Sequence, residues 1–476
     1  MTDSRRDSDL PAEEFRRLGH EVVDWMAGYL DDPRVHPVLP GIAPGELTDR
    51  LPASAPGQGE PMEAILADFS KLILPAVTHW NHPRFMAYFS VSASGPGILA
   101  EMLAAALNTN HMVWKSNPAA AELEQVTLHW LREWLGLPAE FFGQIFDTAS
   151  VSTLHAIAAA RVWAAPETRT EGAPPHMTVY CSEHAHSSVE KSAMALGIGQ
   201  QNVRKVPSDA GFRLCPNHLA EMIRADRAAG KRPFCVVPTT GTTSVSSIDP
   251  VPAVIEIAVR EGLWVHVDAA YGGTAAIVPE LAHILDGCGR AHSLVVNPHK
   301  WLFTPIDLSV LYCSRPDILR QAFALVPEYL KTEEDARAVN FMDYGVPLGR
   351  RFRALKLWFV MRYFGREGVA SILRNHVRWA SELAAQIAAD PRFEVTAPAP
   401  LSLVCFRYRG TNRENHLLLD ELNASGQVFL SGNTMNEVFM IRLAIGNLRT
   451  TRDDVQSVWS LIQETAARLF GTAKPA

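Results

Sequence analysis

One lysine in this sequence occupies a position that suits an amine nucleophile. Lys300 comes soon after the apolar run 294–296, and Trp301, Leu302 and Phe303 follow it directly. Lysine is rarely fully buried without a partner, and an ammonium in apolar surroundings has a lowered pKa. The neutral amine can then attack a carbonyl carbon. Alternatively, the stem of Lys300 packs on Trp301 while its ammonium group reaches water. Residues elsewhere in the sequence are needed to choose between these two interpretations.

Polar side chains also stand at the ends of other apolar runs, as Lys300 stands near the end of the run 294–296. Asp268 ends one run after five largely apolar residues, and Thr243 ends another. Asn297 and His299 stand between the third run and Lys300. Alone, Asp268 would serve equally well as a helix cap or an ion-pair partner. Because ligands of open α/β sheets bind beyond the carboxyl ends of the strands, these side chains are predicted to form one site.

A group of small residues supplies a candidate phosphate cradle. Thr148, Ala149 and Ser150 precede the helical pattern that ends near Arg161. The free N–H groups and the dipole of a helix N-terminus hold phosphate well. As a lone signal this is weak, because Asp147 or Thr148 would also suit as a simple cap.

The cradle, the carboxylate and the lysine together fit one cofactor, pyridoxal 5′-phosphate. Lys300 would form the Schiff base, Asp268 would keep the pyridine nitrogen protonated, and the helix end would take the phosphate. No GxxxxGK[ST], GxGxxG, HExxH or paired CxxC motif competes with this interpretation. The sequence therefore predicts a covalent pyridoxal-phosphate site.

Alternating strands and helices must position these residues. Short, continuous apolar runs indicate strands buried on both faces, and helical stretches separate most of them. This alternation predicts an α/β domain with a mainly parallel sheet, which we place at 86–360. The predicted strands lie within 177–182, 234–243, 263–273, 293–300 and 308–314.

A smaller α+β domain is predicted at 361–476. A long helical region begins near Arg351, and a closing helix is expected at 452–470. Between them, a small antiparallel sheet is predicted from the segments 393–398, 401–410, 428–432 and 438–446.

The first 85 residues are predicted to form a helical arm. Asp9 can cap the first helix, Pro11 lies near its first turn, and Glu13 and Glu14 favour its positive end. A Pro/Gly-rich segment separates this helix from the next one, near Met62. The apolar face of the first helix would therefore pack on a partner subunit; it consists of Phe15, Leu18, Val22, Trp25 and Met26.

The composition excludes several classes of protein. Hydrophobic residues make up 47% and charged residues 20%, and the formal net charge is −7, so nucleic acid is not an expected partner. No apolar run approaches the roughly 18 residues that span a bilayer, and the polar N-terminus has no signal-peptide core. Six cysteines without a CxxC pair indicate reduced thiols and a cytoplasmic location.

Several motifs, in order along nearly the whole chain, resemble one family. The segments NPHKW, HVDAAYGG, TTGTT, AHSSVEK and PLGRRFRALKLWF are similar to those of group II pyridoxal-phosphate decarboxylases, specifically the aromatic-L-amino-acid decarboxylase family. The resemblance implies a fold-type I homodimer that converts aromatic amino acids to amines and CO2. It further implies an N-terminal arm, a large cofactor domain, a small C-terminal domain and an active site at the subunit interface.

The resemblance also implies roles for individual residues. Lys300 matches the Schiff-base lysine and Asp268 the partner of the pyridinium nitrogen. His186 matches the histidine that stacks on the ring and contacts the substrate. Tyr329 matches the tyrosine of a mobile catalytic loop, which would protonate the former α-carbon directly or through His186. The remaining residues expected at the cofactor are Ala149, Ser150, Asn297, Thr243 and His299.

A metal site is the alternative for one of these residues. His184 and His186 could form a metal-binding pair on a strand, but no third ligand is evident. The sequence therefore predicts no metal.

The substrate class rests on fewer residues. Trp80 and Phe89 would line an aromatic pocket or belong to the core, and Gly349 matches a position that is glycine in relatives accepting bulky indole or catechol rings. Ser90 and Val91 replace a Pro-Thr pair whose threonine approaches the ring hydroxyl. Asn110 and His111 likewise replace an Ile-Gly pair. An aromatic or indole preference is therefore favoured over catechol selectivity.

Other functions on the same fold remain open. They are an oxidative aromatic aldehyde synthase, an aminotransferase, a decarboxylase for tyrosine or histidine, and a silent cofactor-binding protein. Aldehyde synthases of the family typically replace the loop tyrosine or the stacking histidine, and this chain keeps Tyr329 and His186. Intact Lys300 and Asp268 argue against a silent protein.

Overall fold

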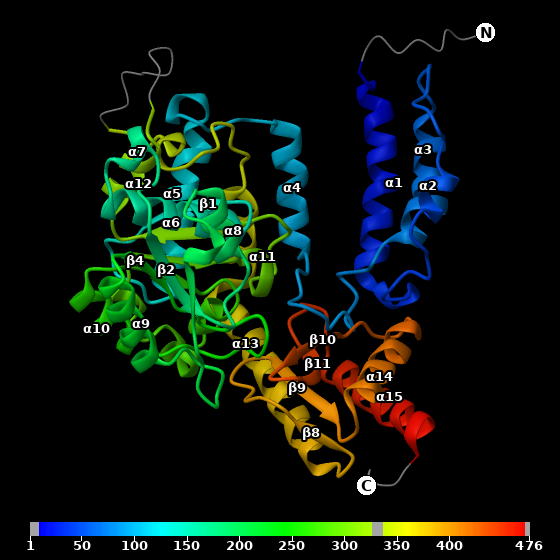
Figure 1. Cartoon of the computed structure of the whole chain (residues 1–476). Coiled ribbons are helices and arrows are strands. Elements are labelled where there is room, and N and C mark those ends of the chain that lie inside the picture. The colour runs from blue at the N-terminus through cyan, green and yellow to red at the C-terminus, as the bar shows by residue number, and fades with distance from the viewer. Residues whose placement is uncertain (1–8, 326–336, 472–476) are drawn as a thin grey trace.

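A seven-stranded sheet forms the centre of the larger part of the molecule (Figure 1). The computed structural model describes residues 9–325 and 337–471. The strand order is β1-β7-β6-β5-β4-β2-β3, and β7 is antiparallel to both of its neighbours while the other pairs are parallel. The mainly parallel sheet is thus confirmed. Its strands are β1 Phe142–Phe146, β2 Met177–Ser182, β3 Val203–Val206, β4 Arg232–Val237, β5 Trp264–Asp268, β6 Ser293–Val296 and β7 Ser309–Cys313.

Helices cover both faces of this sheet, which explains its apolar strands. Every residue of β2, β5, β6 and β7 is buried, so these strands show continuous apolar runs and no alternation. Three predicted runs extend past their strands because they include the polar residues that follow the strand ends. The helices of this part are α4 Gly95–Leu107, α5 Pro118–Trp134, α6 Ala149–Ala164, α7 Thr168–Glu171, α8 Ser188–Ala195, α9 Pro216–Ala228, α10 Val251–Glu261, α11 Pro298–Trp301 and α12 Pro316–Phe323.

A four-stranded antiparallel sheet of order β10-β11-β9-β8 forms the smaller part. Its strands are β8 Phe393–Val395, β9 Leu403–Tyr408, β10 Ser431–Met435 and β11 Val438–Ala444. The strand expected at 428–432 is shifted, because Phe429 bridges to Phe85 before β10 begins. The helices are α13 Ala354–Ala389, interrupted at Gly365, α14 Asn412–Ala424 and α15 Arg452–Phe470, the predicted closing helix.

The N-terminal helices stand apart from the large sheet in Figure 1. They are α1 Ala12–Asp31, α2 Glu46–Arg50 and α3 Met62–Asp68. The cap predicted for α1 was wrong: Asp9 only accepts a hydrogen bond from the Leu10 N–H, and Pro11 is the N-cap. Proline suits this start because its fixed φ and missing N–H do not disturb the first turn. Leu18 is the single buried residue of α1.

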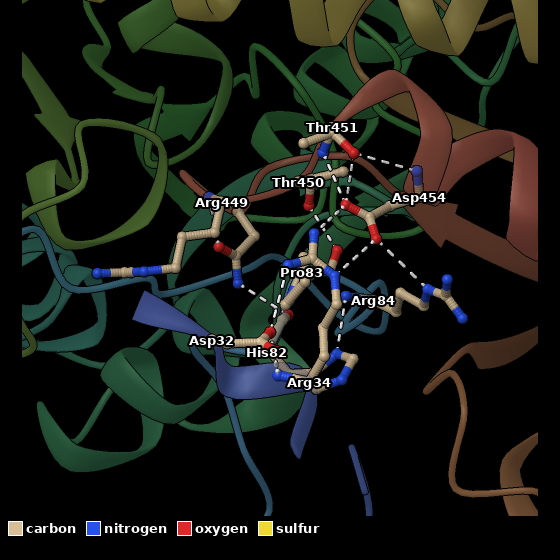
Figure 2. Close-up of polar contacts among 10 residues, drawn as sticks. Asp32, Arg34, His82, Pro83, Arg84, Arg449, Thr450, Thr451 and Asp454 are labelled. Atoms are coloured by element: carbon tan, nitrogen blue, oxygen red, sulfur yellow. Dashed lines mark hydrogen bonds and ion pairs between the residues drawn. The ribbon is translucent and has the colours of Figure 1, made fainter. Parts of the chain in front are cut away.

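Polar contacts join the end of α1 and the segments after it to the first turn of α15 and to the residues just before that helix (Figure 2). Asp454, in the first turn of α15, accepts from Arg34 Nη2 at 2.8 Å and pairs with Arg84 Nε at 3.4 Å. The hydroxyl of Thr450 donates to the Pro83 carbonyl at 2.6 Å, and Arg449 Nε donates to the carbonyl of Leu30 at 3.1 Å. This junction fixes the segment that leads from the arm toward the large sheet.

Short 3-10 or π turns complete the regular structure, at Pro33–Val35, Phe69–Ile73, Leu74–Ala76, Trp114–Ser116, Gln200–Asn202, Gly272–Ile277, Pro279–Leu285, Cys288–Arg290 and Phe341–Tyr344. Within the described ranges, no helix is both long enough and apolar enough to cross a membrane. All six cysteines are free thiols, as the sequence predicted.

Candidate active site

The predicted cofactor residues meet in one cavity of about 200 Å³. It lies beyond the carboxyl ends of β4, β5 and β6 and at the N-terminus of α6, as expected for an open α/β sheet. Each of the eight residues predicted for the cofactor contributes to its wall: Ala149, Ser150, His186, Thr243, Asp268, Asn297, His299 and Lys300.

Lys300 extends from α11, immediately after β6, into this cavity. Trp301, Leu302 and Phe303 behind it are fully buried. Burial lowers the pKa of the Lys300 ammonium, and the nearby carboxylate of Asp268 opposes this change. An amine with a lowered pKa is a better nucleophile at neutral pH, so the local environment suits the first of the two interpretations.

Asp268 is held rigidly at the end of β5. Its backbone N–H donates to the Pro238 carbonyl and its carbonyl accepts from the Thr240 N–H, each at 2.9 Å. Its Oδ1 also accepts from the Ala270 N–H at 3.1 Å. Asp268 as a whole is only 6% exposed. The carboxylate is thereby fixed where a cationic ring nitrogen could meet it.

The wall of the cavity also offers unused hydrogen-bonding groups. Thr148 is the N-cap of α6, yet its hydroxyl bonds to Asp147 and not to the helix, so the first N–H groups of α6 lack a side-chain cap. Among the described residues, the buried Asn297 Oδ1 and Thr239 Oγ1 have no hydrogen-bond partner. A ligand with both donors and acceptors would satisfy this arrangement.

His299 adds a donor with a defined tautomer. Its Nδ1 accepts from the Leu308 N–H at 2.9 Å, which places the ring proton on Nε2. Burial, aided by Lys300, lowers the pKa of His299 to about 3. A neutral imidazole with one N–H donor suits a phosphate oxygen. Together with the helix end, the carboxylate and the lysine, this donor set fits pyridoxal phosphate.

His186 lies at the border between this cavity and a larger one. Its Nδ1 accepts from the Ser188 N–H at 3.1 Å. Burial lowers the pKa of His186, Asp268 opposes this, and Lys300 reinforces it. His184 instead contacts Ser208 Oγ at 3.0 Å and lines neither cavity. In the part of the chain that the structure describes, no cluster of His, Cys, Asp and Glu could hold a metal.

The larger cavity has a volume of about 740 Å³ and opens beside Lys300. Trp80, Phe89 and Val91, predicted for the substrate, all line it. Other residues that line the cavities, among them Tyr88, were not predicted from the sequence. The only signal for Tyr88 was its place beside Phe89. The residues missed in the two cavities are Asn81, Tyr88, Ala93, Thr239, Gly241, Ala270, Tyr271, Pro305 and Ile306.

A stack of three rings starts at Phe89, which lines both cavities, and continues through Tyr271, which lines the smaller one. Phe89 stacks on Tyr271 with centroids 3.6 Å apart, and Tyr271 stacks on Trp301 at 4.8 Å. The Tyr271 hydroxyl is hydrogen-bonded to Ser402 Oγ at 2.5 Å. The Lys300 ammonium lies 5.5 Å from the centroid of Phe89. This stack couples the residue that follows Lys300 to the wall of the larger cavity.

One described residue predicted for the substrate is not brought to either cavity of this chain. Gly349 lines neither of them, and its nearest neighbour is Asn110 Nδ2, 4.0 Å from where a Cβ would lie. Asn110 Oδ1 accepts from the Arg350 N–H at 2.9 Å. Tyr329 lies outside the described residues.

Comparisons with known proteins agree with the site. The family described as "Pyridoxal-dependent decarboxylase conserved domain" matches residues 44–409. The aromatic-L-amino-acid decarboxylase of Bos taurus is 40% identical over 97% of this chain and 98% of its own length. The tryptophan decarboxylase TDC2 of Camptotheca acuminata is 39% identical over 97% and 96%.

Solved structures superpose over nearly the whole chain. The structure of Oryza sativa TDC with PLP and tryptamine has a TM-score of 0.94 at 34% identity, covering 98% of this chain and 100% of its own. The 4-hydroxyphenylacetaldehyde synthase of Rhodiola rosea has a TM-score of 0.91 at 35% identity, covering 97% and 99%.

Proposed function

The chain belongs to the pyridoxal-dependent decarboxylases, and from this membership we propose that it converts aromatic L-amino acids into the corresponding amines and CO2. The fold is fold type I of the pyridoxal-phosphate enzymes, as predicted, and pyridoxal phosphate is the cofactor. The observation that carries the aromatic assignment is the larger cavity, whose ring-lined wall opens directly beside Lys300.

The residues of the smaller cavity that were predicted for the cofactor each have a proposed task. When bound, pyridoxal phosphate supplies an electron sink for the bond that breaks as CO2 leaves. Lys300 would hold the cofactor covalently and be displaced by the substrate amine. Asp268 would keep a proton on the ring nitrogen. The N-terminus of α6, with Ala149 and Ser150, would bind the phosphate together with Asn297 and His299, while Thr243 would line the ring.

The protonation that completes the reaction is assigned to a phenol. Tyr329 would deliver a proton to the former α-carbon, directly or through His186, and this assignment rests on the sequence match. A phenol has an ordinary pKa of about 10, so it is protonated at neutral pH as a donor must be. His186 would stack on the cofactor ring and touch the substrate carboxylate, since it borders both cavities.

The substrate class proposed is tryptophan, 5-hydroxytryptophan or DOPA. Trp80, Tyr88 and Phe89 provide flat apolar surface for a ring, and Val91 offers no hydrogen bond to a ring hydroxyl. The test is an amine-product assay across tryptophan, 5-hydroxytryptophan, DOPA, tyrosine, phenylalanine and histidine. We expect the highest kcat/KM with an indole substrate. Amine from histidine alone would contradict the proposal.

An aldehyde synthase is the second candidate, because one such enzyme superposes closely on the chain. Retention of His186 and Tyr329 favours the decarboxylase. Measuring peroxide beside the amine separates the two functions, since only the oxidative reaction forms it.

The assembly proposed is a homodimer with the active site at the interface, in a cytoplasmic setting. The apolar helix α4 leaves Leu99, Leu103 and Leu107 at least half exposed, and α1 leaves Phe15 and Trp25 exposed. Exposed apolar helix faces of this kind mark interaction surfaces. Gly349 would then act in the partner's site. Light scattering after size-exclusion chromatography should give twice the monomer mass of 52.4 kDa.

A further inference from the structure

Arg442, on β11 of the small sheet, is a buried cation without a carboxylate. It is 4% exposed, and among the residues that the structure describes no Asp or Glu forms an ion pair with it. The other arginine buried to this degree, Arg350, pairs with the buried Glu124. Burial lowers the pKa of Arg442, yet a guanidinium stays charged in proteins. A buried charge without an ionic partner is costly. The charge of Arg442 is therefore stabilised by the neutral groups that accept its hydrogen bonds.

Those partners lie on two walls of the larger cavity. Arg442 Nη2 donates to the Thr243 carbonyl at 2.6 Å and to the Tyr88 carbonyl at 3.4 Å. Thr243 and Tyr88 both line the cavity, and they belong to segments far apart in the sequence. Arg442 Nε also donates to the carbonyl of Ser244 at 2.9 Å. The guanidinium of Arg442 therefore links the segment of Thr243 and Ser244 to the segment of Tyr88 by hydrogen bonds.

Tyr88 needs such support because its backbone is strained. Its φ is +50°, a left-handed conformation that is unfavourable for a bulky side chain and persists only where the surroundings enforce it. The Tyr88 N–H donates to Ser431 Oγ at 3.2 Å, and Arg442 Nη1 donates to the same oxygen at 2.7 Å. Both backbone groups of Tyr88 are thus held by the pair of Arg442 and Ser431.

The same arginine also contacts the next residue of the wall. Its Cζ lies 5.7 Å from the ring centroid of Phe89, the ring that stacks on Tyr271. Arg442 itself lines neither cavity. It can therefore shape the wall without touching the substrate or the cofactor.

We propose that Arg442, acting with Ser431, is a positioning residue that fixes the Tyr88–Phe89 wall against Thr243 and so sets the affinity for the aromatic substrate. The substrate part of this proposal rests on the proposed function. The small sheet then contributes to substrate binding, although the cofactor residues all come from the large part of the molecule.

The test compares Arg442→Lys with Arg392→Lys in the holoenzyme. Lysine keeps the charge but loses the planar fork that reaches several carbonyls. Arg392 is the control because it lies in the small part, pairs with Asp390 at 2.7 Å and lines neither cavity. The first readout is hydrogen–deuterium exchange without substrate. Arg442→Lys should speed exchange in peptides covering 84–92 and leave peptides covering 293–300 unchanged.

Kinetics supply the second readout. With the aromatic substrate, Arg442→Lys should raise KM roughly tenfold, a loss comparable to one good hydrogen bond. The kcat and the visible absorbance of the bound cofactor should stay near the parent values. In a double-mutant cycle with Tyr88→Ala, the two effects on KM should be less than additive, since both variants disturb the same wall.

Unchanged exchange in 84–92 with an unchanged KM would overturn the proposal, as would additive effects in the cycle. If Arg442→Lys does not fold, Ser431→Ala tests the same pair of residues. It should speed exchange in 84–92 and raise KM, each by less than is expected for Arg442→Lys. Parental exchange and KM in Ser431→Ala would then overturn it. A parent enzyme that forms no amine would refute the proposed function alone, because the exchange measurement still decides the role of Arg442.

Discussion

The smaller cavity is built from adjacent strand ends of one sheet, whereas the larger cavity takes much of its wall from a segment outside that sheet. Asp268 and Asn297 hold their places because β5 and β6 are paired in parallel. The segment 80–93 is instead bound to the small sheet: Met86 exchanges backbone hydrogen bonds with Phe429 and Ala444, each at 2.9 Å. The chemistry and the selectivity of the enzyme are thus supported by different parts of the fold, and they should be separable by mutation.

The largest effect should come from the cofactor cavity. Lys300→Ala removes the one lysine among the described residues that line the cofactor cavity, so turnover should be lost while the protein stays folded. Borohydride reduction followed by peptide mass spectrometry should find a pyridoxyl group on Lys300 in the parent and none in the variant. Circular dichroism checks the fold. Amine release at the parental rate by Lys300→Ala would refute the assignment.

A large effect is also expected at Tyr329, the proposed proton donor. Tyr329→Phe keeps the ring and deletes the acid, so amine formation should fall roughly 10²–10⁴-fold, the usual contribution of a general acid. The electron pair on the former α-carbon would then persist longer and would be oxidised by dioxygen. After hydrolysis the products are aldehyde, ammonia and hydrogen peroxide. Peroxide and aldehyde assays check this. If the variant forms amine at the parental rate without peroxide, His186 is the better candidate for the acid.

The dependence of kcat/KM on pH should report the protonation of His186, which borders both cavities. Since burial lowers its folded pKa below the ordinary value of about 6.5, the imidazole stays neutral until the pH falls below that value. The kcat/KM should be flat from pH 8 to 6.5 and decline at lower pH. His186→Gln should abolish this acid limb, and the control His184→Gln should retain it. An acid limb centred above pH 6.5 would contradict the neutral stacking role.

The smallest effect should come from the substrate wall. Val91→Thr exchanges a methyl for a hydroxyl at nearly constant volume, so the kcat/KM ratio of DOPA to tryptophan should rise roughly fivefold, the worth of about one hydrogen bond. Ser90→Ala is the control, because the buried Ser90 lines neither cavity and its hydroxyl has no partner in the described structure. An unchanged ratio in Val91→Thr would place the ring elsewhere in the cavity.

The same division explains what the sequence could and could not predict. The sequence was sufficient to predict Lys300, Asp268 and Asn297. Parallel strands bring their carboxyl ends to the same edge of the sheet, so polar side chains that follow such strands lie close to one another. Tyr88 and Arg442 were missed because their roles depend on contacts between the two sheets and on a positive φ, neither of which a local pattern reveals. Gly349 was assigned through the family match, and it lines neither cavity of this chain; in the proposed homodimer it would act in the partner's site. The Asp9 cap failed because a proline two residues later suited the helix start.

The most direct test of the account is the stoichiometry of products from carboxyl-labelled tryptophan. The purified holoenzyme should release labelled CO2 and tryptamine in a ratio of one to one, without peroxide, and Lys300→Ala should release neither. Labelled CO2 accompanied by aldehyde and peroxide, or no labelled CO2 from any aromatic amino acid, would contradict it.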